Sequence, residues 1–420
     1  MHSTSFWVNA ARCARIALLL APIAAAGPSL SERLSLEQAL ARSLASNKQL
    51  AAFGHRLDEQ RGRLEQASLL PNPQLAVIAE NVGGQGDFSG TDSAELTISL
   101  GWAIEPGLRG RRVGLAHARS ERIGLDAKIL RLDVAAETAQ HFLSCLESQL
   151  HLRDADEAVA AADEAVVVVE RRVRAGRAPN AELMRARAEL ATELLARDDV
   201  THEMSVAYHR LAAQWGQTEP GFTRVDGELL ELPVVPPFDQ LAARIEHNPE
   251  LARLASDERI AEARLGLAKA RRLPTVSPTL GARRFEGSGD WAVVAGVSVP
   301  LQLFDRNQGE VLESRAAVSR LRADALAERV RVHTRLFEIY QEMQHSVHRA
   351  EVFREEVLPR LQEALAETRR GYEQGRYPYF ELRALQADWL AVRRSLVEAS
   401  AAAHRLVITL ERLTGERLAR

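Results

Sequence analysis

The chain has 420 residues, of which 46% are hydrophobic and 26% are charged, a composition that excludes intrinsic disorder as the main state. Basic and acidic residues nearly balance at a formal net charge of −3, so charge gives no support for nucleic acid as a partner. Aromatic residues make up only 5%. The apolar residues are mostly Ala, Leu and Val, which suits long helices packed side by side.

The first residues have the features of a secretory signal. Arg12 and Arg15 precede an apolar run over 16–26 that ends in small residues, which predicts a signal peptide over 1–26. The run is shorter than the ~18–20 apolar residues of a spanning helix, and no later stretch reaches that length. We therefore expect an exported chain that could cross a bilayer only with strands. Cys13 precedes the run, and the other thiol, Cys145, is interpreted as a small buried apolar residue.

The mature chain resembles itself at a spacing of 199 residues. Residues 176–183 and 375–382 agree at five of eight positions. We therefore predict two repeats, over 27–215 and 238–420, with a Pro- and Gly-rich connector over 216–237 that holds a small strand within 223–230. Each repeat is expected to contain a first helix (36–69 and 238–271), a β-hairpin (about 74–104 and 279–301), a long helix (111–175 and 307–374), a tip (176–180 and 375–378) and a return helix (180–215 and 378–415).

The long helices are unusual for a globular protein. Each covers about 65 residues, and at ~1.5 Å per residue each would be ~100 Å long. Their apolar residues follow two stripes, each with spacings of 3 and 4; Phe337 lies on one stripe and Leu336 on the other. Two apolar stripes on one helix indicate a packed neighbouring helix on each side. A ring of such helices makes a hollow cylinder; a plain helical bundle is the alternative.

The predicted hairpins carry strands of about ten residues with one apolar face. That length and alternation match transmembrane strands, although two soluble hairpins packed on a core are the alternative. Four strands cannot close a barrel in lipid, where open edges are costly, so several chains must share one barrel. The residues expected to face lipid are Leu96, Ile98, Leu100, Trp102, Trp291, Val293, Val297 and Val299.

Together these features resemble the TolC-like outer-membrane efflux family. The resemblance rests on the element order given twice, on 36–40 (LEQAL) opening the first repeat, and on Asn47 and 248–251 (NPEL) ahead of the next helices. It implies a fold that is mainly α with a small β part: a long coiled-coil-like helical barrel continued by a transmembrane β-barrel. It also implies that three chains with four strands each close the barrel as a homotrimer in the outer membrane, extending into the periplasm.

Residues 299–309 (VPLQLFDRNQG) resemble the CzcC-type branch of that family. The resemblance implies the exit duct of a tripartite pump for cobalt, zinc, cadmium or related cations. Its partners would be a periplasmic adaptor and an inner-membrane, proton-driven pump of the resistance-nodulation-division type. Within the motif, Asp305 is expected to cap the long helix that follows.

The resemblance also places the two tips at the periplasmic aperture, where the adaptor docks. Glu381 would form a ring of three carboxylates in a trimer, which would attract cations; the alternative is that the tip glutamates only favour a helix N-terminus. The tip residues so identified are Gly176, Pro179, Glu182, Leu183, Gly375, Pro378, Glu381 and Leu382.

No catalytic or phosphate-binding motif occurs in the sequence, so we expect neither an enzyme nor a cofactor. His345 and His348, like His202 and His209, have helical spacing that would suit a metal if a third ligand converged, but we interpret them as surface or seam residues. Two other functions stay open: the same duct serving drugs, organic solutes or type I secretion, and a periplasmic coiled-coil scaffold without a pore.

Overall fold

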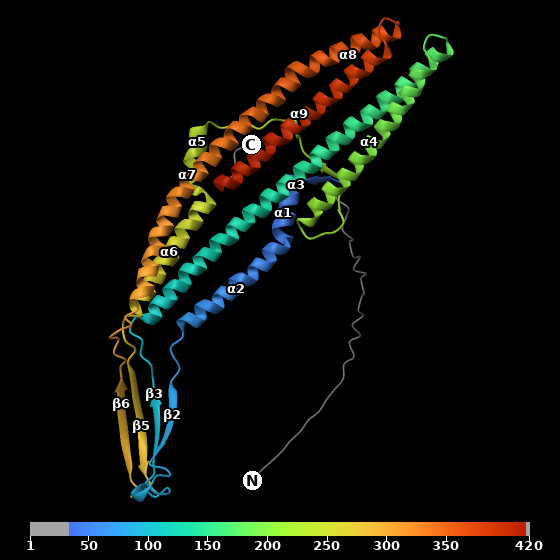
Figure 1. Ribbon diagram of the computed structural model, residues 1–420. Coiled ribbons are helices and arrows are strands. Elements are labelled where there is room, and N and C mark those ends of the chain that lie inside the picture. Colours follow the sequence, from blue (N-terminus) through green and yellow to red (C-terminus); the bar gives the residue numbers. More distant parts are fainter. Residues whose placement is uncertain (1–32, 417–420) are drawn as a thin grey trace, which may run out of the picture.

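The computed structural model describes residues 33–416. It shows an elongated molecule with a sheet at one end and two helical hairpins at the other (Figure 1). The predicted fold class, mainly helical with a small sheet part, is confirmed. The predicted signal peptide, residues 1–26, lies outside the described residues.

The main elements follow the predicted order in both halves. The helices are α1 (Leu36–Ser46), α2 (Lys48–Ser68), α3 (Leu108–Arg174), α4 (Asn180–Ala213), α5 (Phe238–Ala243), α6 (Pro249–Ala270), α7 (Gln308–Val352), α8 (Leu358–Glu373) and α9 (Tyr379–Thr414), with the 3-10 helices η1 (Gly86–Phe88) and η2 (Arg244–His247). The strands are β1 (Arg33–Ser35), β2 (Gln74–Glu80), β3 (Glu95–Gly101), β4 (Arg224–Asp226), β5 (Ser277–Phe285) and β6 (Trp291–Ser298).

Both hairpins join into one antiparallel sheet in the order β2-β3-β5-β6. Leu100 of β3 lies opposite Leu75 of β2 and Leu280 of β5. Since side chains alternate between the two faces of a strand, this register gathers most of the large apolar residues of the four strands on one face, whereas Ile78, Phe285 and Val294 lie on the other. β2 and β6 form the edges, and no other strand of residues 33–416 lies beside them.

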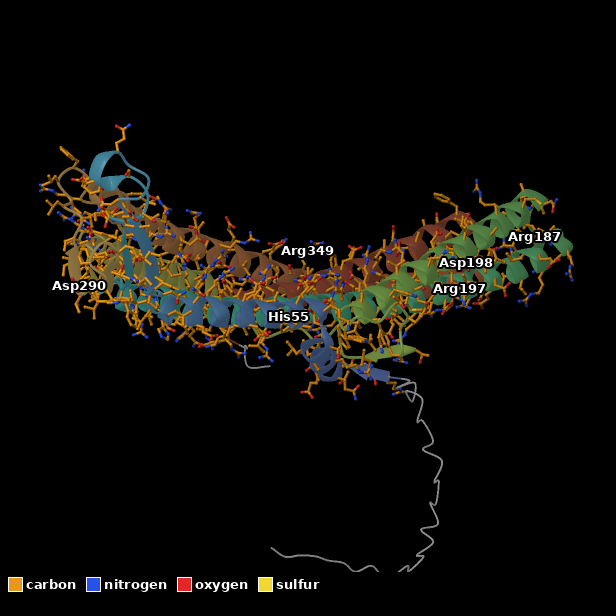
Figure 2. The ribbon with its side chains drawn as sticks, turned by 90° about the horizontal axis from the view of Figure 1, so that it is seen from below. His55, Arg187, Arg197, Asp198, Asp290 and Arg349 are labelled. Atoms are coloured by element: carbon orange, nitrogen blue, oxygen red, sulfur yellow. The ribbon has the colours of Figure 1, made fainter. Side chains whose placement is uncertain are left out.

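The helices stand side by side in a single layer. Near the sheet their order is α2-α3-α6-α7, and toward the tips it is α4-α3-α9-α8 (Figure 1). From below, this layer is a curved slab with side chains on both surfaces, and α1 projects from its convex side (Figure 2). The slab has two open sides, formed by α2 and α4 on one and by α7 and α8 on the other.

The first helix of each repeat is divided, which corrects the prediction of single helices over 36–69 and 238–271. The divisions fall at Asn47 and Asn248. Each asparagine is an N-cap: its side-chain oxygen accepts from the backbone N–H groups two and three residues later. The capping bond replaces helical hydrogen bonds at the break, and the chain therefore changes direction there.

The second long helix is also interrupted, unlike the uninterrupted helix predicted over 307–374. A π-helical turn, η3 (Phe353–Val357), separates α7 from α8. Pro359 lies just after it and has no N–H to donate to the carbonyl four residues earlier, so the helix must widen or break at this point. At the 199-residue spacing the first repeat has Ala160, and α3 runs unbroken.

The largest core cluster lies at the middle of the molecule, where α1, α3, α4 and α9 meet. Here β4, inside the predicted strand region 223–230, pairs in parallel with β1, a strand that the sequence did not predict. Cys145 is fully buried in this cluster, as predicted, and burial raises the pKa of its thiol to about 12. Among the described residues, no helix is both long and apolar enough to cross a membrane.

Candidate functional site

The apolar face of the sheet is exposed on the single chain. Side-chain alternation on β3 is clear, because Leu96, Ile98 and Leu100 are exposed whereas Thr97 between them is buried. On β6, Val293 is 79% exposed. All eight residues that were expected to face lipid are exposed: Leu96, Ile98, Leu100, Trp102, Trp291, Val293, Val297 and Val299.

The opposite face of the sheet is more polar and carries a charged cluster that the sequence analysis did not predict. Arg283 of β5 pairs with Glu95 of β3 at 2.7 Å and with Glu80 of β2 at 2.8 Å. Its Nε atom also donates to the hydroxyl of Thr97 at 2.8 Å. One guanidinium thus ties three strands together, and the cluster has a formal charge of −1.

Each tip is a tight helix–helix turn at a glycine. Gly176 and Gly375 have φ values of +70° and +75°, a left-handed conformation that glycine adopts without strain and that ends helices. Pro179 and Pro378 directly precede α4 and α9. These four residues are exposed, so they form the outer surface of the tips.

The leucines at the tips have a different position. Leu183 and Leu382 are only 7% and 6% exposed and belong to a small core shared by the two hairpins. Glu381 is exposed, whereas Glu182 is half-buried, and its Oε2 atom is buried without a hydrogen-bond partner in the described part of the chain. The two glutamates therefore have different surroundings despite their matching sequence positions.

Polar contacts link the α3–α4 hairpin to the α8–α9 hairpin close to the tips. The Tyr379 hydroxyl donates to Glu189 at 2.7 Å, and Arg383 pairs with the same carboxylate at 2.9 Å. Arg172 lies over the ring of Tyr372, 4.4 Å from its centroid, and donates to the Tyr372 carbonyl. Burial and the bond to Glu189 raise the pKa of Tyr379, so the phenol stays protonated at neutral pH.

An ion-pair ladder continues this seam toward the sheet. Arg393, Arg405 and Arg412 of α9 each pair with acidic residues of α3. The best-buried acid is Asp154, a partner of Arg393, and burial raises the pKa of its carboxyl despite the opposing effect of that arginine. The partners on α3 are Asp133, Glu147, Asp154 and Glu157.

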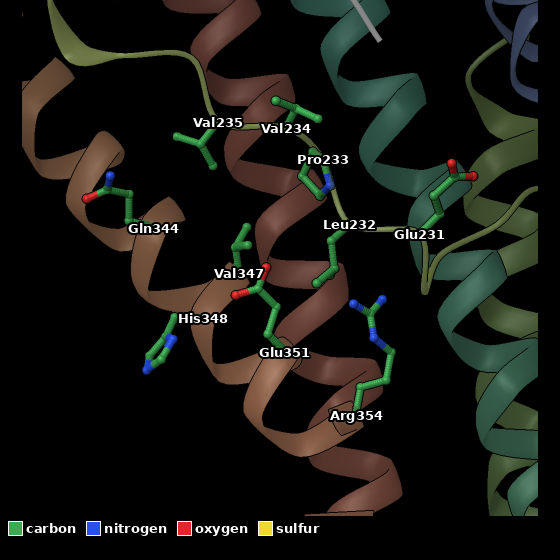
Figure 3. A pocket seen from close by; sticks show the side chains of 10 residues that line it. All are labelled: Glu231, Leu232, Pro233, Val234, Val235, Gln344, Val347, His348, Glu351 and Arg354. Atoms are coloured by element: carbon green, nitrogen blue, oxygen red, sulfur yellow. The ribbon is translucent and has the colours of Figure 1, made fainter. Parts of the chain in front are cut away.

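The histidines show no metal site. His345 and His348 are exposed, as are His202 and His209, and residues 33–416 contain no group of three or more potential ligands that could hold a metal ion. His348 lies on the rim of an open groove of about 620 Å³ between residues 231–235 of the connector and α7 (Figure 3). That groove combines apolar connector residues with Glu351 and Arg354.

The motif that precedes α7 has a different cap from the one predicted. The N-cap is Asn307, which has a φ of +55°, and its side chain makes no capping bond. Asp305 instead accepts from the Asn307 N–H at 2.8 Å, and the Asn307 amide reaches back to the Ala268 carbonyl of α6 at 2.9 Å. Asp305 therefore shapes the turn, and Asn307 attaches it to the neighbouring helix.

Comparison with known proteins gives consistent matches. The family model described as outer membrane efflux protein matches residues 39–217 and 242–416. The cobalt-zinc-cadmium resistance protein CzcC of Cupriavidus metallidurans is 27% identical over 394 residues, which cover 94% of this chain and 92% of that protein. The nickel-cobalt-cadmium resistance protein NccC of Alcaligenes xylosoxydans xylosoxydans is 25% identical over 326 residues, which cover 76% and 72%.

The fold also matches solved structures. The outer membrane protein VceC of Vibrio cholerae superposes with a TM-score of 0.74 at 17% identity, over 91% of this chain and 97% of that one. Such a likeness shows the fold and carries no information on the exported solute.

Proposed function

The chain belongs to the outer membrane efflux protein family, and from that membership we propose that it is the exit duct of a tripartite pump that exports divalent heavy-metal cations. Proteins of this family are channels and not enzymes. The observation that carries the choice of substrate is the similarity to CzcC over 94% of the chain, together with the similarity to NccC. Both relatives are metal-resistance proteins by name.

The duct would be a homotrimer, as channels of this family generally are. Its barrel would present to lipid the exposed apolar face that contains Val293 and Leu100, since membrane barrels are apolar outside and polar inside. The polar face with Arg283 would then line the lumen. Support comes from the open edges of the sheet, because unpaired backbone groups are costly in lipid and need partners from further chains.

The partners would be a periplasmic adaptor and an inner-membrane, proton-driven pump of the resistance-nodulation-division type. The adaptor would dock on the exposed tip residues Gly176, Pro179, Gly375 and Pro378. Because Leu183 and Leu382 are buried, they would support the tips from inside and make no direct contact with the adaptor. Half-buried Glu182 would belong to the seam between the hairpins.

The exposed Glu381 is proposed to form a carboxylate ring at the aperture, which attracts cations. Glu381→Gln should therefore lower the cation selectivity of reconstituted channels, measured as the reversal potential in a KCl gradient. Glu373→Gln, which changes an exposed acid on the preceding helix, is the matched control. An unchanged reversal potential for Glu381→Gln would contradict the ring.

The substrate is tested in the native host. We expect deletion of the gene to lower tolerance to at least one of cobalt, zinc, cadmium and nickel, and a plasmid copy to restore it. A panel of drugs and organic solutes is measured in parallel. Unchanged metal tolerance with raised drug sensitivity would replace the metal assignment by a drug duct, while a water-soluble chain absent from the outer-membrane fraction would exclude a duct altogether.

A further inference from the structure

Three arginines gather on neighbouring helices close to the sheet. Arg63 of α2 and Arg264 of α6 lie within about the last two turns of their helices. Arg119 lies on α3, which runs between α2 and α6 (Figure 1). All three side chains reach solvent. Partial burial, and next the charges of Arg264 and Arg63, lower the pKa of the Arg119 guanidinium, so the three positive charges are close enough to affect one another.

Contacts between the helices hold the three arginines together. The buried amide of Gln60, about one turn before Arg63, donates to the Ala116 carbonyl at 3.0 Å and so fixes α2 against α3. On the other side of α3, Arg259 of α6 pairs with Glu121 at 3.5 Å. Because α2 and α6 run toward the sheet and α3 runs away from it, the arginines of α2 and α6 lie at similar heights, about one turn closer to the sheet than the arginine of α3.

The cluster faces the concave surface of the slab. α1 projects from the convex side (Figure 2) and shares a groove of about 350 Å³ with Ala139 of α3. At about 3.6 residues per turn, Arg119 lies about 200° around α3 from Ala139, whereas Glu121 lies on the same side as Ala139. Arg259, the partner of Glu121, is therefore on the convex side, and Arg264, five residues later, is about 140° around α6 from it.

The cluster has few acidic partners. In the described part of the chain, no carboxylate pairs with Arg119 or Arg264. Arg63 pairs only with exposed Glu59 of its own helix, at 3.6 Å. Glu310 of α7 lies near Arg264, but two other side chains already donate to its carboxylate at 2.7 Å. Since like charges repel each other, guanidinium groups held together with so few carboxylates favour an anion between them.

We propose that Arg63, Arg119 and Arg264 bind a multivalent oxyanion on the concave surface. Guanidinium groups suit phosphate and carboxylate oxygens because they donate planar pairs of charge-assisted hydrogen bonds. One step rests on the proposed function: in a homotrimeric duct the concave surface lines the lumen. Three such clusters would oppose the passage of divalent cations at this level, whereas bound anions would neutralise the clusters and let the cations pass.

Binding is measured first, on the purified full chain in detergent, by equilibrium dialysis against radiolabelled inorganic phosphate in a buffer without other multivalent anions. Arg119→Gln and Arg264→Gln should each weaken binding by about tenfold, as expected when one charge-assisted hydrogen-bonding group is lost. Arg259→Gln is the matched control, because it removes an exposed arginine of α6 on the convex side. Competition with citrate distinguishes the source of the ligand, since tighter binding of citrate than of phosphate would identify a polycarboxylate.

The effect on cations is measured as the reversal potential of reconstituted channels in a KCl gradient, with and without equal phosphate on both sides. Phosphate should shift wild-type channels toward cation selectivity. Arg119→Gln channels should be more cation-selective from the start and should respond less to phosphate.

Two results would overturn the site: no saturable phosphate binding, or equal weakening by Arg259→Gln and Arg119→Gln. Binding at the site without a shift in reversal potential would overturn its role in cation passage. Protein that binds phosphate as expected but forms no channel would contradict the proposed duct and leave the site standing, so the two failures are distinguishable. The substitutions on α3 and α6 cover the case in which one of them prevents folding.

Discussion

The paired asparagine caps give a prediction with a calculable size. Asn248 is fully buried. Its oxygen accepts from the N–H groups of Glu250 and Leu251, both at 2.9 Å, and its amide donates to the Leu413 carbonyl at the end of α9, at 2.7 Å. One side chain thus joins the start of α6 to the end of α9.

Asn248→Ala removes both functions. Loss of the cap costs about 1 kcal/mol, and the partly buried Leu413 carbonyl, left without its partner, costs about 1–3 kcal/mol. The expected destabilisation is therefore about 2–4 kcal/mol. Asn248→Ser keeps an oxygen that can cap the helix but is too short to reach Leu413, so it should cost only about 1–3 kcal/mol.

The assay is thermal unfolding of purified protein in detergent, followed by helical circular dichroism. The expected order of melting temperature is wild type, then Asn248→Ser, then Asn248→Ala. The exposed Asn72 supplies the control, because Asn72→Ala should stay within about 0.5 kcal/mol of wild type. If Asn248→Ser has the same melting temperature as the wild type, the bond to Leu413 contributes nothing to stability and the reasoning fails.

Three further predictions concern the tips, the core cluster at the middle of the molecule and the sheet. Tyr379→Phe removes the hydroxyl that binds Glu189, so the link between the two hairpins should weaken by about 0.5–1.5 kcal/mol. Single-channel conductance in planar bilayers should therefore rise. Tyr377→Phe is the control, and equal conductance of the two variants would argue against a link. Native Cys145 should resist maleimide at neutral pH, because its thiol is buried and its pKa is raised to about 12, and should react fully in denaturant; rapid labelling of native protein would contradict this. Arg283→Gln leaves Glu80 and Glu95 uncompensated, changing the cluster charge from −1 to −2, so cation selectivity should increase, whereas Arg284→Gln on the apolar face should not alter the reversal potential.

The sequence is most informative where a pattern of residue types recurs along the chain. Apolar alternation identified the strands, and Gly176 and Gly375 marked the helix turns because a left-handed residue ends a helix. Asn47 and Asn248 enter the sequence analysis only through the family resemblance, although an asparagine followed by helix formers is also a recognised N-cap signal. Pro359 is a signal in the sequence for an interruption of the second long helix, because proline has no N–H to donate inside a helix.

Other features could not be deduced because they depend on residues distant in sequence. Arg283 meets Glu80 only through the pairing of β3 with β5, which joins the two repeats. The ladder formed by Arg393, Arg405 and Arg412 likewise requires the register between α3 and α9. Burial of Leu183 and Leu382 follows from packing of the two hairpins against each other, whereas the local sequence pattern at each tip showed only a turn.

The two unlike edges of the sheet have a consequence for copy number. If the β6 edge of one copy paired with the β2 edge of the next, the contact would be head-to-tail, so it would use different surfaces on each molecule and would not by itself stop at any number of subunits. Only the bend that each chain adds brings the last subunit back to the first. Substitutions that flatten the slab should therefore leave neighbouring subunits bound while producing larger rings or open filaments. The number of subunits would then be set by the curvature of each chain and not by the strength of binding between them.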